Sequence, residues 1–161
     1  PEEVEKHKMK TGSVANYPGA EKIPGAHCFE QDADILIPAA LENSITQDNA
    51  NIIKAKVIIE LANGPVTPEA DEILNQKGIL VVPDILANAG GVTVSYFEQA
   101  QNAGDYYWPE KEVLHKLEGV MRKAFDEIWQ IKEKHQTDMR TAAYILAVSR
   151  VAQAMRDRGW A

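Results

Sequence analysis

The sequence predicts an α/β fold in which a doubly wound parallel sheet is followed by long carboxyl-terminal helices. Two observations predict it. Short apolar runs alternate with helical segments from residue 34 to about residue 95, as strands and helices do in a parallel sheet. The runs do not alternate apolar with polar residues, which is typical of strands buried on both faces, so we expect helices on both sides of the sheet.

The individual elements follow from local patterns. Residues 1–31 are charged and then rich in turn-forming residues, which predicts a short helix and a surface loop. Thr46 is a candidate N-cap for the first helix between the strands. Thr67 is the candidate N-cap for the second, which begins at Pro68 and stops at Gly78. The expected elements are strands at 34–37, 56–61 and 79–82 and helices near 47–54, near 68–77 and from about 88.

The last third of the chain predicts two long helices. Over residues 110–136, apolar residues recur at spacings of three and four, which predicts one apolar stripe on an amphipathic helix. Over 139–158, apolar side chains are spread around much of the circumference, which predicts a helix buried against several neighbours. Gly159 is a typical residue to end this helix.

The amino-acid composition argues against several classes of binding partner. Of the 161 residues, 45% are apolar and 25% are charged, as in one ordinary water-soluble domain. Acidic side chains outnumber basic ones by 24 to 17, which argues against a nucleic-acid partner. The longest apolar runs are too short to cross a bilayer, so we expect no membrane contact and a cytoplasmic protein. Cys28 is the only cysteine and the four histidines are isolated, so no metal site is expected.

The segments that follow the three predicted strands share small side chains. In open α/β sheets the ligand crevice lies beyond the carboxyl ends of the strands. Ala39 and Ala40 follow the first strand, and Asn63 and Asn88 supply amide groups after the second and third. This pattern predicts a nucleotide-sized groove. A simple turn at Asn63 and a helix cap at Asn88 are the structural alternatives.

Ser95 and Val92 lie further along the helix that starts near residue 88. Ser95 follows Asn88 by seven residues, about two helical turns, and Val92 precedes Ser95 by three, so all three are expected on one face. The Ser95 hydroxyl could bind a substrate carboxylate or bond to a carbonyl of its own helix. Tyr96 and Phe97 are expected in the core. No Gly-x-Gly-x-x-Gly motif occurs, so the pyrophosphate-binding turn is not in this chain.

Four blocks of the sequence resemble the hexameric glutamate dehydrogenase family of bacteria and archaea. The block at 83–98 is highly specific, and the similarity runs over essentially the whole chain. The resemblance implies the second half of a Rossmann-like sheet, that is, a partial NAD(P)-binding domain with carboxyl-terminal helices over residues 1–161. The blocks lie at 38–42, 60–71, 83–98 and 140–144.

The resemblance also implies a reaction. The family oxidises L-glutamate to 2-oxoglutarate and ammonia, passes a hydride to NAD or NADP, and assembles as a homohexamer. By this resemblance, Asn63 and Asn88 lie near the nicotinamide ribose and carboxamide, and Ala39 and Ala40 line the dinucleotide groove. Ser95 and Val92 belong to the substrate pocket, where Ser95 contacts the side-chain carboxylate and Val92 shapes the wall. The expected site residues are therefore Ala39, Ala40, Asn63, Asn88, Val92 and Ser95.

The sequence departs from the family in one large respect. It begins after the point where the glycine-rich loop, the ribose-binding acid and the substrate domain would lie, and the catalytic lysine and aspartate would lie there too. No catalytic residue is therefore expected within the chain, and we predict no turnover by the chain alone. One alternative is a noncatalytic binding or assembly module that keeps the fold. Another is a dehydrogenase for a different amino acid, against which the Ser95 hydroxyl argues.

Overall fold

Three short parallel strands form the centre of the molecule. The computed structural model describes residues 2–160, and its strands are β1 (Ile35–Leu36), β2 (Val57–Ile59) and β3 (Leu80–Val82). They pair in the order β1-β2-β3, with Ile58 of β2 opposite Leu36 on one side and Val81 on the other. The three predicted apolar runs are thus the strands, in sequence order and parallel. The prediction of a mixed α/β fold with long carboxyl-terminal helices is confirmed.

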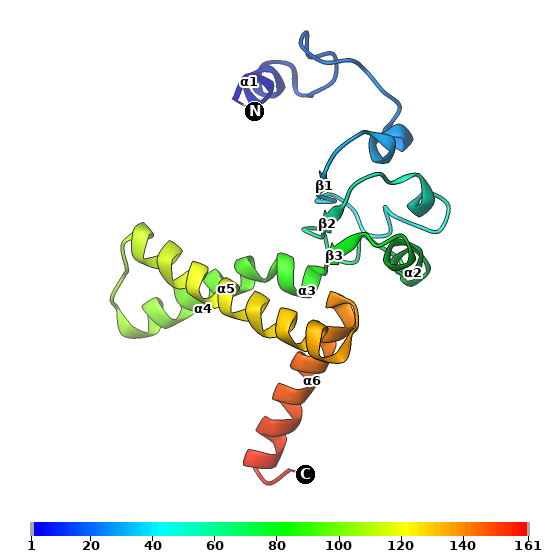
Figure 1. Cartoon of the computed structure of the whole chain (residues 1–161). Helices are drawn as coiled ribbons and strands as arrows, with labels where there is room; N and C mark the ends of the chain where they lie inside the picture. The colour runs from blue at the N-terminus through cyan, green and yellow to red at the C-terminus, as the bar shows by residue number, and fades with distance from the viewer. Residues whose placement is uncertain (1, 161) are drawn as a thin grey trace.

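Helices flank the sheet beside β3 and extend beyond it (Figure 1). Thr67 caps α2 as predicted, because its hydroxyl oxygen accepts the Ala70 N–H at 3.3 Å. Gly78 follows α2 with a φ of 73°, a left-handed conformation that favours glycine. The helices are α1 (Glu2–Thr11), α2 (Pro68–Gln76), α3 (Asp84–Ala87), α4 (Ala89–Gly104), α5 (Glu110–His135) and α6 (Met139–Asp157), with 3-10 turns at Gly25–Glu30 and Ala50–Ile52.

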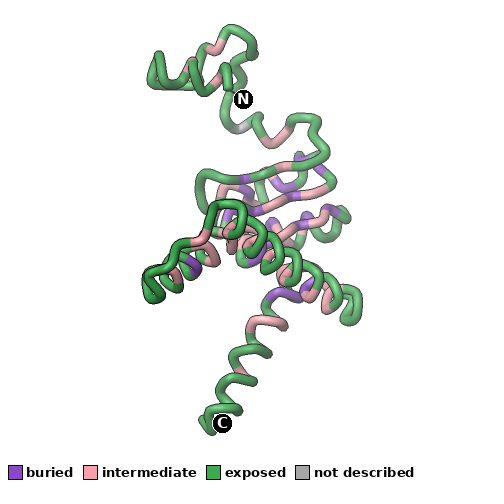
Figure 2. Tube along the Cα trace, turned by 90° about the vertical axis from the view of Figure 1, so that its left-hand side faces the viewer, coloured by how far each residue is buried: buried purple, intermediate pink, exposed green. Residues whose placement is uncertain are grey.

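Two apolar clusters lie on opposite faces of the sheet. One joins Ile58 and Val81 to residues of α2 and of the loop before β2. The other joins Leu80 and Val82 to α5 and α6. Successive residues of β3 thus enter different clusters, as the alternation of side chains along a strand requires. The expected helical cover on both faces is present around β3, and the buried residues gather around the sheet (Figure 2). At the edge strand β1, Ile35 stays 52% exposed.

The prediction of a helix near 47–54 is wrong. The segment forms a turn followed by the short 3-10 turn Ala50–Ile52. Thr46 starts this turn and not an α-helix: its hydroxyl oxygen accepts the Asp48 N–H at 3.3 Å, and its backbone N–H donates to the Asn49 side chain at 2.8 Å. The Asn49 amide in turn donates to the Ser44 carbonyl at 2.9 Å. Such side-chain bonds to nearby backbone groups favour a turn over a helix, and Ala50 and Ile53 still fill the core.

The last helix is less buried than expected. Met139, Ala142 and Ala143 in its first turns are buried, but Val148 and Val151 are 64% and 61% exposed. The reason is geometric, because α6 meets the sheet only at its start and then runs away from it (Figure 1). The amino-terminal segment lies at the opposite end of the molecule. Among residues 2–160, no helix combines the length and apolar character needed to cross a bilayer.

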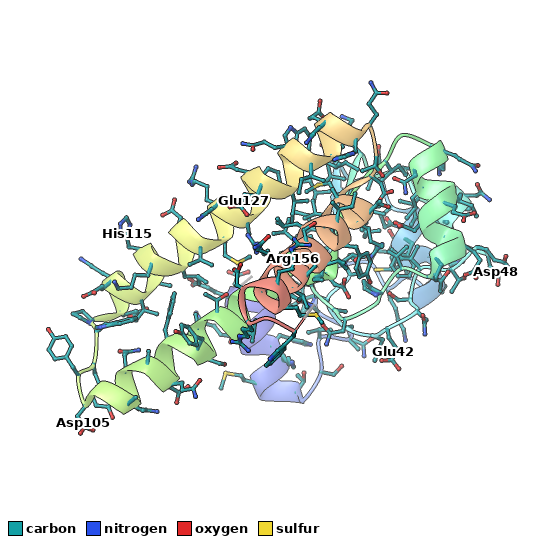
Figure 3. All side chains as sticks on the ribbon, turned by 90° about the horizontal axis from the view of Figure 1, so that it is seen from below. Glu42, Asp48, Asp105, His115, Glu127 and Arg156 are labelled. Carbon is teal, nitrogen blue, oxygen red and sulfur yellow. The ribbon has the colours of Figure 1, made fainter. Side chains whose placement is uncertain are left out.

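Helices α4 and α5 form an antiparallel hairpin that projects from the sheet (Figure 1). Phe97 of α4 is buried and meets Trp108 edge-to-face, with ring centroids 5.7 Å apart. The expectation that Tyr96 lies in the core is wrong, because its side chain is 65% exposed. Asp105 lies at the tip of the hairpin and His115 on the exposed face of α5 (Figure 3).

Candidate functional site

Backbone hydrogen bonds bring the three strand exits together at one edge of the sheet. The Pro38 carbonyl, which follows β1, accepts the Leu61 and Ala62 N–H groups at 3.1 and 2.9 Å. This ties the exit of β1 to the exit of β2. The exit of β3 joins them through Asn88, whose side-chain amide donates to the Leu61 carbonyl at 3.3 Å. Because parallel strands point the same way, these exits share one rim of the sheet.

Asn63 and Asn88 meet at this rim. The Asn88 amide nitrogen donates to the Asn63 side-chain oxygen at 2.7 Å, although 25 residues separate them. Asn88 occupies the N-cap position of α4, as the structural alternative expected, but its side chain makes no cap bond and instead contacts Asn63. Within residues 2–160 no hydrogen bond uses the Asn63 amide nitrogen or the Asn88 oxygen. The pair therefore presents one free donor and one free acceptor, which is the complement of a primary carboxamide.

Small side chains flank the asparagine pair. Ala39 and Ala40 are exposed directly after Pro38, and Gly64 is exposed directly after Asn63. The Gly64 φ is 53°, in the left-handed region, which lets the backbone turn back at the rim. The Gly64 N–H donates to an Asp84 carboxylate oxygen at 2.8 Å, so the turn is anchored to the start of α3. A flat ligand can approach the backbone closely at such a rim.

Ser95 and Val92 lie on α4, beyond the asparagine pair. The Ser95 hydroxyl donates to the Gly91 carbonyl at 3.1 Å, which is the bond within its own helix that the sequence left open. The hydroxyl is exposed and its oxygen keeps acceptor capacity. Val92 is 70% exposed. No hydrogen bond among the described residues joins Ser95 to Asn63 or Asn88, so the structure brings the two asparagines into contact and leaves Ser95 separate from them.

An apolar hollow of about 490 Å³ opens beside the rim. It is lined by Ile59 and Val82 at the ends of two strands, by Ala87 just before Asn88, and by Met121 and Phe125 of α5. A second hollow, of about 640 Å³, lies at the opposite edge of the sheet around Gly78, Ile79 and Thr137. Of these two hollows, the first adjoins the strand exits, so it is the one that extends the candidate site.

A group of charged side chains is hydrogen-bonded to the segments that form the rim. This group was not predicted from the sequence. Glu60, which follows β2 directly, is fully buried. Its two carboxylate oxygens accept the Asp84 N–H at 2.8 Å and an Arg140 N–H at 2.6 Å. Arg140 of α6 also donates to Asp71 of α2 at 2.9 Å. The only sequence signal is a carboxylate placed at the end of an apolar run, where burial demands a partner.

The electrostatics of this cluster favour a charged Arg140. Burial by itself would lower the pKa of the guanidinium. The hydrogen bonds to Glu60 and Asp71 outweigh that effect, and the pKa of Arg140 is raised above its ordinary value. Arg140 is therefore positively charged at neutral pH, and it compensates the buried carboxylate of Glu60.

Comparison with known proteins gives a consistent result. The family model described as Glutamate/Leucine/Phenylalanine/Valine dehydrogenase matches residues 1–159. A glutamate dehydrogenase of Thermotoga maritima is 55% identical over 158 residues, which cover 98% of this chain and 38% of that protein. An NAD-specific glutamate dehydrogenase of Clostridioides difficile is 56% identical over 149 residues, which cover 92% of this chain and 35% of that protein.

A solved structure shows the same arrangement. The hetero-hexameric glutamate dehydrogenase of Thermus thermophilus, in its leucine-bound form, superposes with a TM-score of 0.90 at 32% identity. The superposition covers 98% of this chain and 37% of that chain. The chain thus spans 35–38% of the length of these relatives.

Proposed function

The chain belongs to the glutamate/leucine/phenylalanine/valine dehydrogenase family, and from this membership we propose that it is the carboxyl-terminal portion of an NAD(P)-dependent glutamate dehydrogenase. The reaction is the oxidation of L-glutamate, with water, to 2-oxoglutarate and ammonia. In this proposal the chain contributes binding residues for the dinucleotide and for the substrate, and the catalytic residues lie outside the chain. The relatives named as glutamate dehydrogenases, at 55% and 56% identity, support the choice of substrate.

The observation that carries the proposal is the Asn63–Asn88 hydrogen bond at the meeting point of the strand exits. The free donor of Asn63 and the free acceptor of Asn88 fit the carboxamide of a nicotinamide ring, with the ribose close by. Ala39 and Ala40 leave room for the rest of the dinucleotide along the rim. When bound, the nicotinamide supplies the hydride acceptor. The residues of this chain orient it and limit its movement.

Ser95 and Val92 form the substrate side of the proposed site. The Ser95 oxygen keeps acceptor capacity beside its bond to Gly91, and its proton can turn toward a substrate carboxylate. Val92, on the same helix and largely exposed, gives an apolar wall for the methylene groups of glutamate. A hydroxyl at this place favours a substrate with a polar side chain over leucine or valine.

The choice between NAD and NADP is open in this proposal. Three relatives are named NAD-specific, which favours NAD. We also propose that the complete enzyme assembles as a hexamer in the cytoplasm, which the hetero-hexameric Thermus thermophilus relative supports for the assembly. The exposed apolar residues of β1 and of the outer part of α6 favour a portion of a larger enzyme over a self-contained binding module.

The test compares the chain alone with the chain in an enzyme context. Purified chain incubated with glutamate and NAD or NADP should give no reduced dinucleotide. A chimaera, in which these 161 residues replace the matching segment of the Thermotoga maritima enzyme, should reduce the dinucleotide in a glutamate-dependent manner. Turnover by the chain alone, or a folded chimaera without glutamate-dependent activity, would contradict the proposal.

A further inference from the structure

We propose that Arg140 is a positioning residue for the dinucleotide site, which fixes Asn63 and Asn88 relative to each other through the carboxylates of Glu60 and Asp84. The inference rests on the proposed function only for its kinetic readout. Arg140 lies in the first turn of α6 and makes no contact with Asn63 or Asn88 among the described hydrogen bonds. Its effect on them must pass through other residues.

One guanidinium group joins four elements. Arg140 Nη2 donates to Glu60 Oε1 at 2.6 Å, at the end of β2. Its Nε donates to Asp71 Oδ2 of α2 at 2.9 Å. Its Nη1 lies 3.7 Å from Asp84 Oδ1, at the start of α3. A planar guanidinium places five N–H groups on three separate nitrogens in a fixed geometry, whereas a lysine presents its three N–H groups from one atom and does not reproduce these three contacts.

The contacts pass from Arg140 to the rim in two further steps. Glu60 uses its second oxygen to accept the Asp84 N–H at 2.8 Å, which fixes the start of α3. Asp84 then accepts the Gly64 N–H at 2.8 Å. Gly64 follows Asn63 directly, and α3 ends at Ala87, directly before Asn88. The loop that carries Asn63 and the helix that leads to Asn88 are therefore held by the same two carboxylates.

Charge makes this arrangement depend on Arg140. Three carboxylates, from Glu60, Asp71 and Asp84, surround one guanidinium, and the Glu60 side chain has no exposure to solvent. Without the guanidinium, Glu60 would be a buried charge without a cation, next to two other carboxylates. Repulsion would then move Glu60 or Asp84, and with them the Gly64 anchor and the start of α3.

A purely structural role of Arg140 predicts a different pattern of local stability after its replacement than a positioning role does. If Arg140 only attached α6 to the sheet, its loss would weaken all parts of the fold that depend on α6 and would leave the rim as it is. If Arg140 positions the rim, its loss changes the segments around Asn63 and Asn88 more than the rest. Backbone hydrogen exchange separates these patterns, because it reports protection segment by segment.

The first experiment measures amide exchange by mass spectrometry in the full chain. In Arg140→Lys, segments 61–66 and 84–90 should exchange about tenfold faster or more, while α5 keeps its protection. Arg156→Lys is the matched control, because Arg156 also lies on α6 and donates to a side chain, Gln153, on the exposed outer part of that helix. Unchanged exchange at 61–66 and 84–90 in Arg140→Lys, or the same acceleration throughout the chain, would overturn the proposal.

The second experiment measures kinetics in the chimaera. Arg140→Lys should raise the KM for the dinucleotide about fivefold or more, with the KM for glutamate within about twofold. Arg156→Lys should change neither. Equal changes in both KM values, or none, would overturn the positioning role. A chimaera without any activity in its unsubstituted form would instead contradict the proposed function, while the exchange experiment would still decide the role of Arg140.

A double variant covers the case in which Arg140→Lys does not fold. Glu60→Gln with Arg140→Gln removes the fully buried carboxylate together with its cation, and only the partly exposed Asp71 and Asp84 keep their charges. The glutamine amide that replaces the guanidinium is too short to reproduce its three contacts. The same local exchange and the same rise in dinucleotide KM are expected, and their absence in this folded variant would overturn the proposal.

Discussion

Single side chains at the rim determine what the proposed site can bind. The Asn63–Asn88 contact uses the NH2 group of Asn88 and the carbonyl oxygen of Asn63 and leaves the Asn63 NH2 group and the Asn88 oxygen free, so the pair is fixed in orientation before any ligand arrives. The convergence of these residues followed from the sequence, because both come after strands of one parallel sheet. Their direct hydrogen bond did not, because it depends on a side-chain orientation that no sequence pattern encodes.

Replacing Asn88 tests this contact. In the chimaera, Asn88→Ala removes a proposed carboxamide acceptor and frees Asn63, so the dinucleotide KM should rise about tenfold, which corresponds to roughly 1.4 kcal/mol of lost binding free energy. Steady-state kinetics at saturating glutamate measures it. Asn102→Ala, an exposed asparagine near the other end of α4, is the control and should leave the KM unchanged. Equal kinetics for the two variants would rule out this role of Asn88.

Arg140 shows the limit of sequence reasoning at the same scale. Its partners Asp71 and Glu60 lie 69 and 80 residues away along the chain. No local pattern joins them, and only the folded arrangement of β2, α2 and α6 brings them together. A charged residue at the end of an apolar run was the available signal, and it identifies Glu60 as a group in need of a partner without saying which.

Secondary-structure elements were predictable where the residues at their ends favour the start or the end of a helix. The bounds of α5 and α6 lie within one residue of the predicted ends, because periodicity and terminal residues agree there. The prediction for 47–54 failed because Thr46 and Asn49 bond to nearby backbone groups, which propensity and apolar spacing do not register. The prediction for the outer part of α6 failed for another reason. Its apolar residues indicate burial, but the described chain supplies no neighbour for them.

The start of α6 gives a pH-dependent prediction. Asp138 caps this helix, because its Oδ1 accepts the Thr141 N–H at 2.7 Å. Burial would raise the pKa of this carboxyl, but its hydrogen bonds from Thr141 and Thr137 outweigh burial and lower the pKa below the ordinary 3.8. A carboxyl with a lowered pKa in the folded state stabilises the fold fully above the ordinary value, and this contribution is lost as pH falls through the lowered pKa.

Asp138→Asn should therefore destabilise the chain by a few tenths to about 1 kcal/mol at pH 7, because asparagine keeps the cap but loses the charge. At about pH 3 the difference from the unsubstituted chain should shrink. Urea unfolding at both pH values measures the two free energies. Asp48→Asn, at an exposed position in a turn, is the control. A difference that stays constant between the two pH values would contradict the assignment.

At the scale of the whole molecule, much apolar surface is exposed for a chain of this size. Tyr144, Val148 and Val151 lie on the outer part of α6 at helical spacing and are each more than half exposed. At the other side of the sheet, Ile35 of the edge strand is 52% exposed. Such surfaces promote association, because burying them removes apolar area from water. The parallel sheet and its helical cover were predictable, but the exposure of the outer part of α6 was not, because its apolar residues predict burial.

We expect the isolated chain to associate in solution. Light scattering coupled to gel filtration should give a mass above the 17.8 kDa of a monomer. Replacing Val148 and Val151 with serine should shift the population toward the monomer, because it removes apolar area from the exposed face of α6. Val14→Ser, at a 56% exposed position in the amino-terminal segment, is the control. A monomer for the unsubstituted chain at high concentration would favour a self-contained module.

The complete burial of Glu60 has a consequence for how related sequences can diverge. A mutation that removes the Arg140 cation leaves the Glu60 carboxylate buried without a cation, and one that removes Glu60 takes away the shortest of the three ion pairs of Arg140. A protein with either change alone is less stable. A protein in which neutral residues replace both side chains has neither a buried carboxylate without its cation nor a cation without that carboxylate. Positions 60 and 140 should therefore covary across the family, with few natural sequences that keep one charge and lose the other.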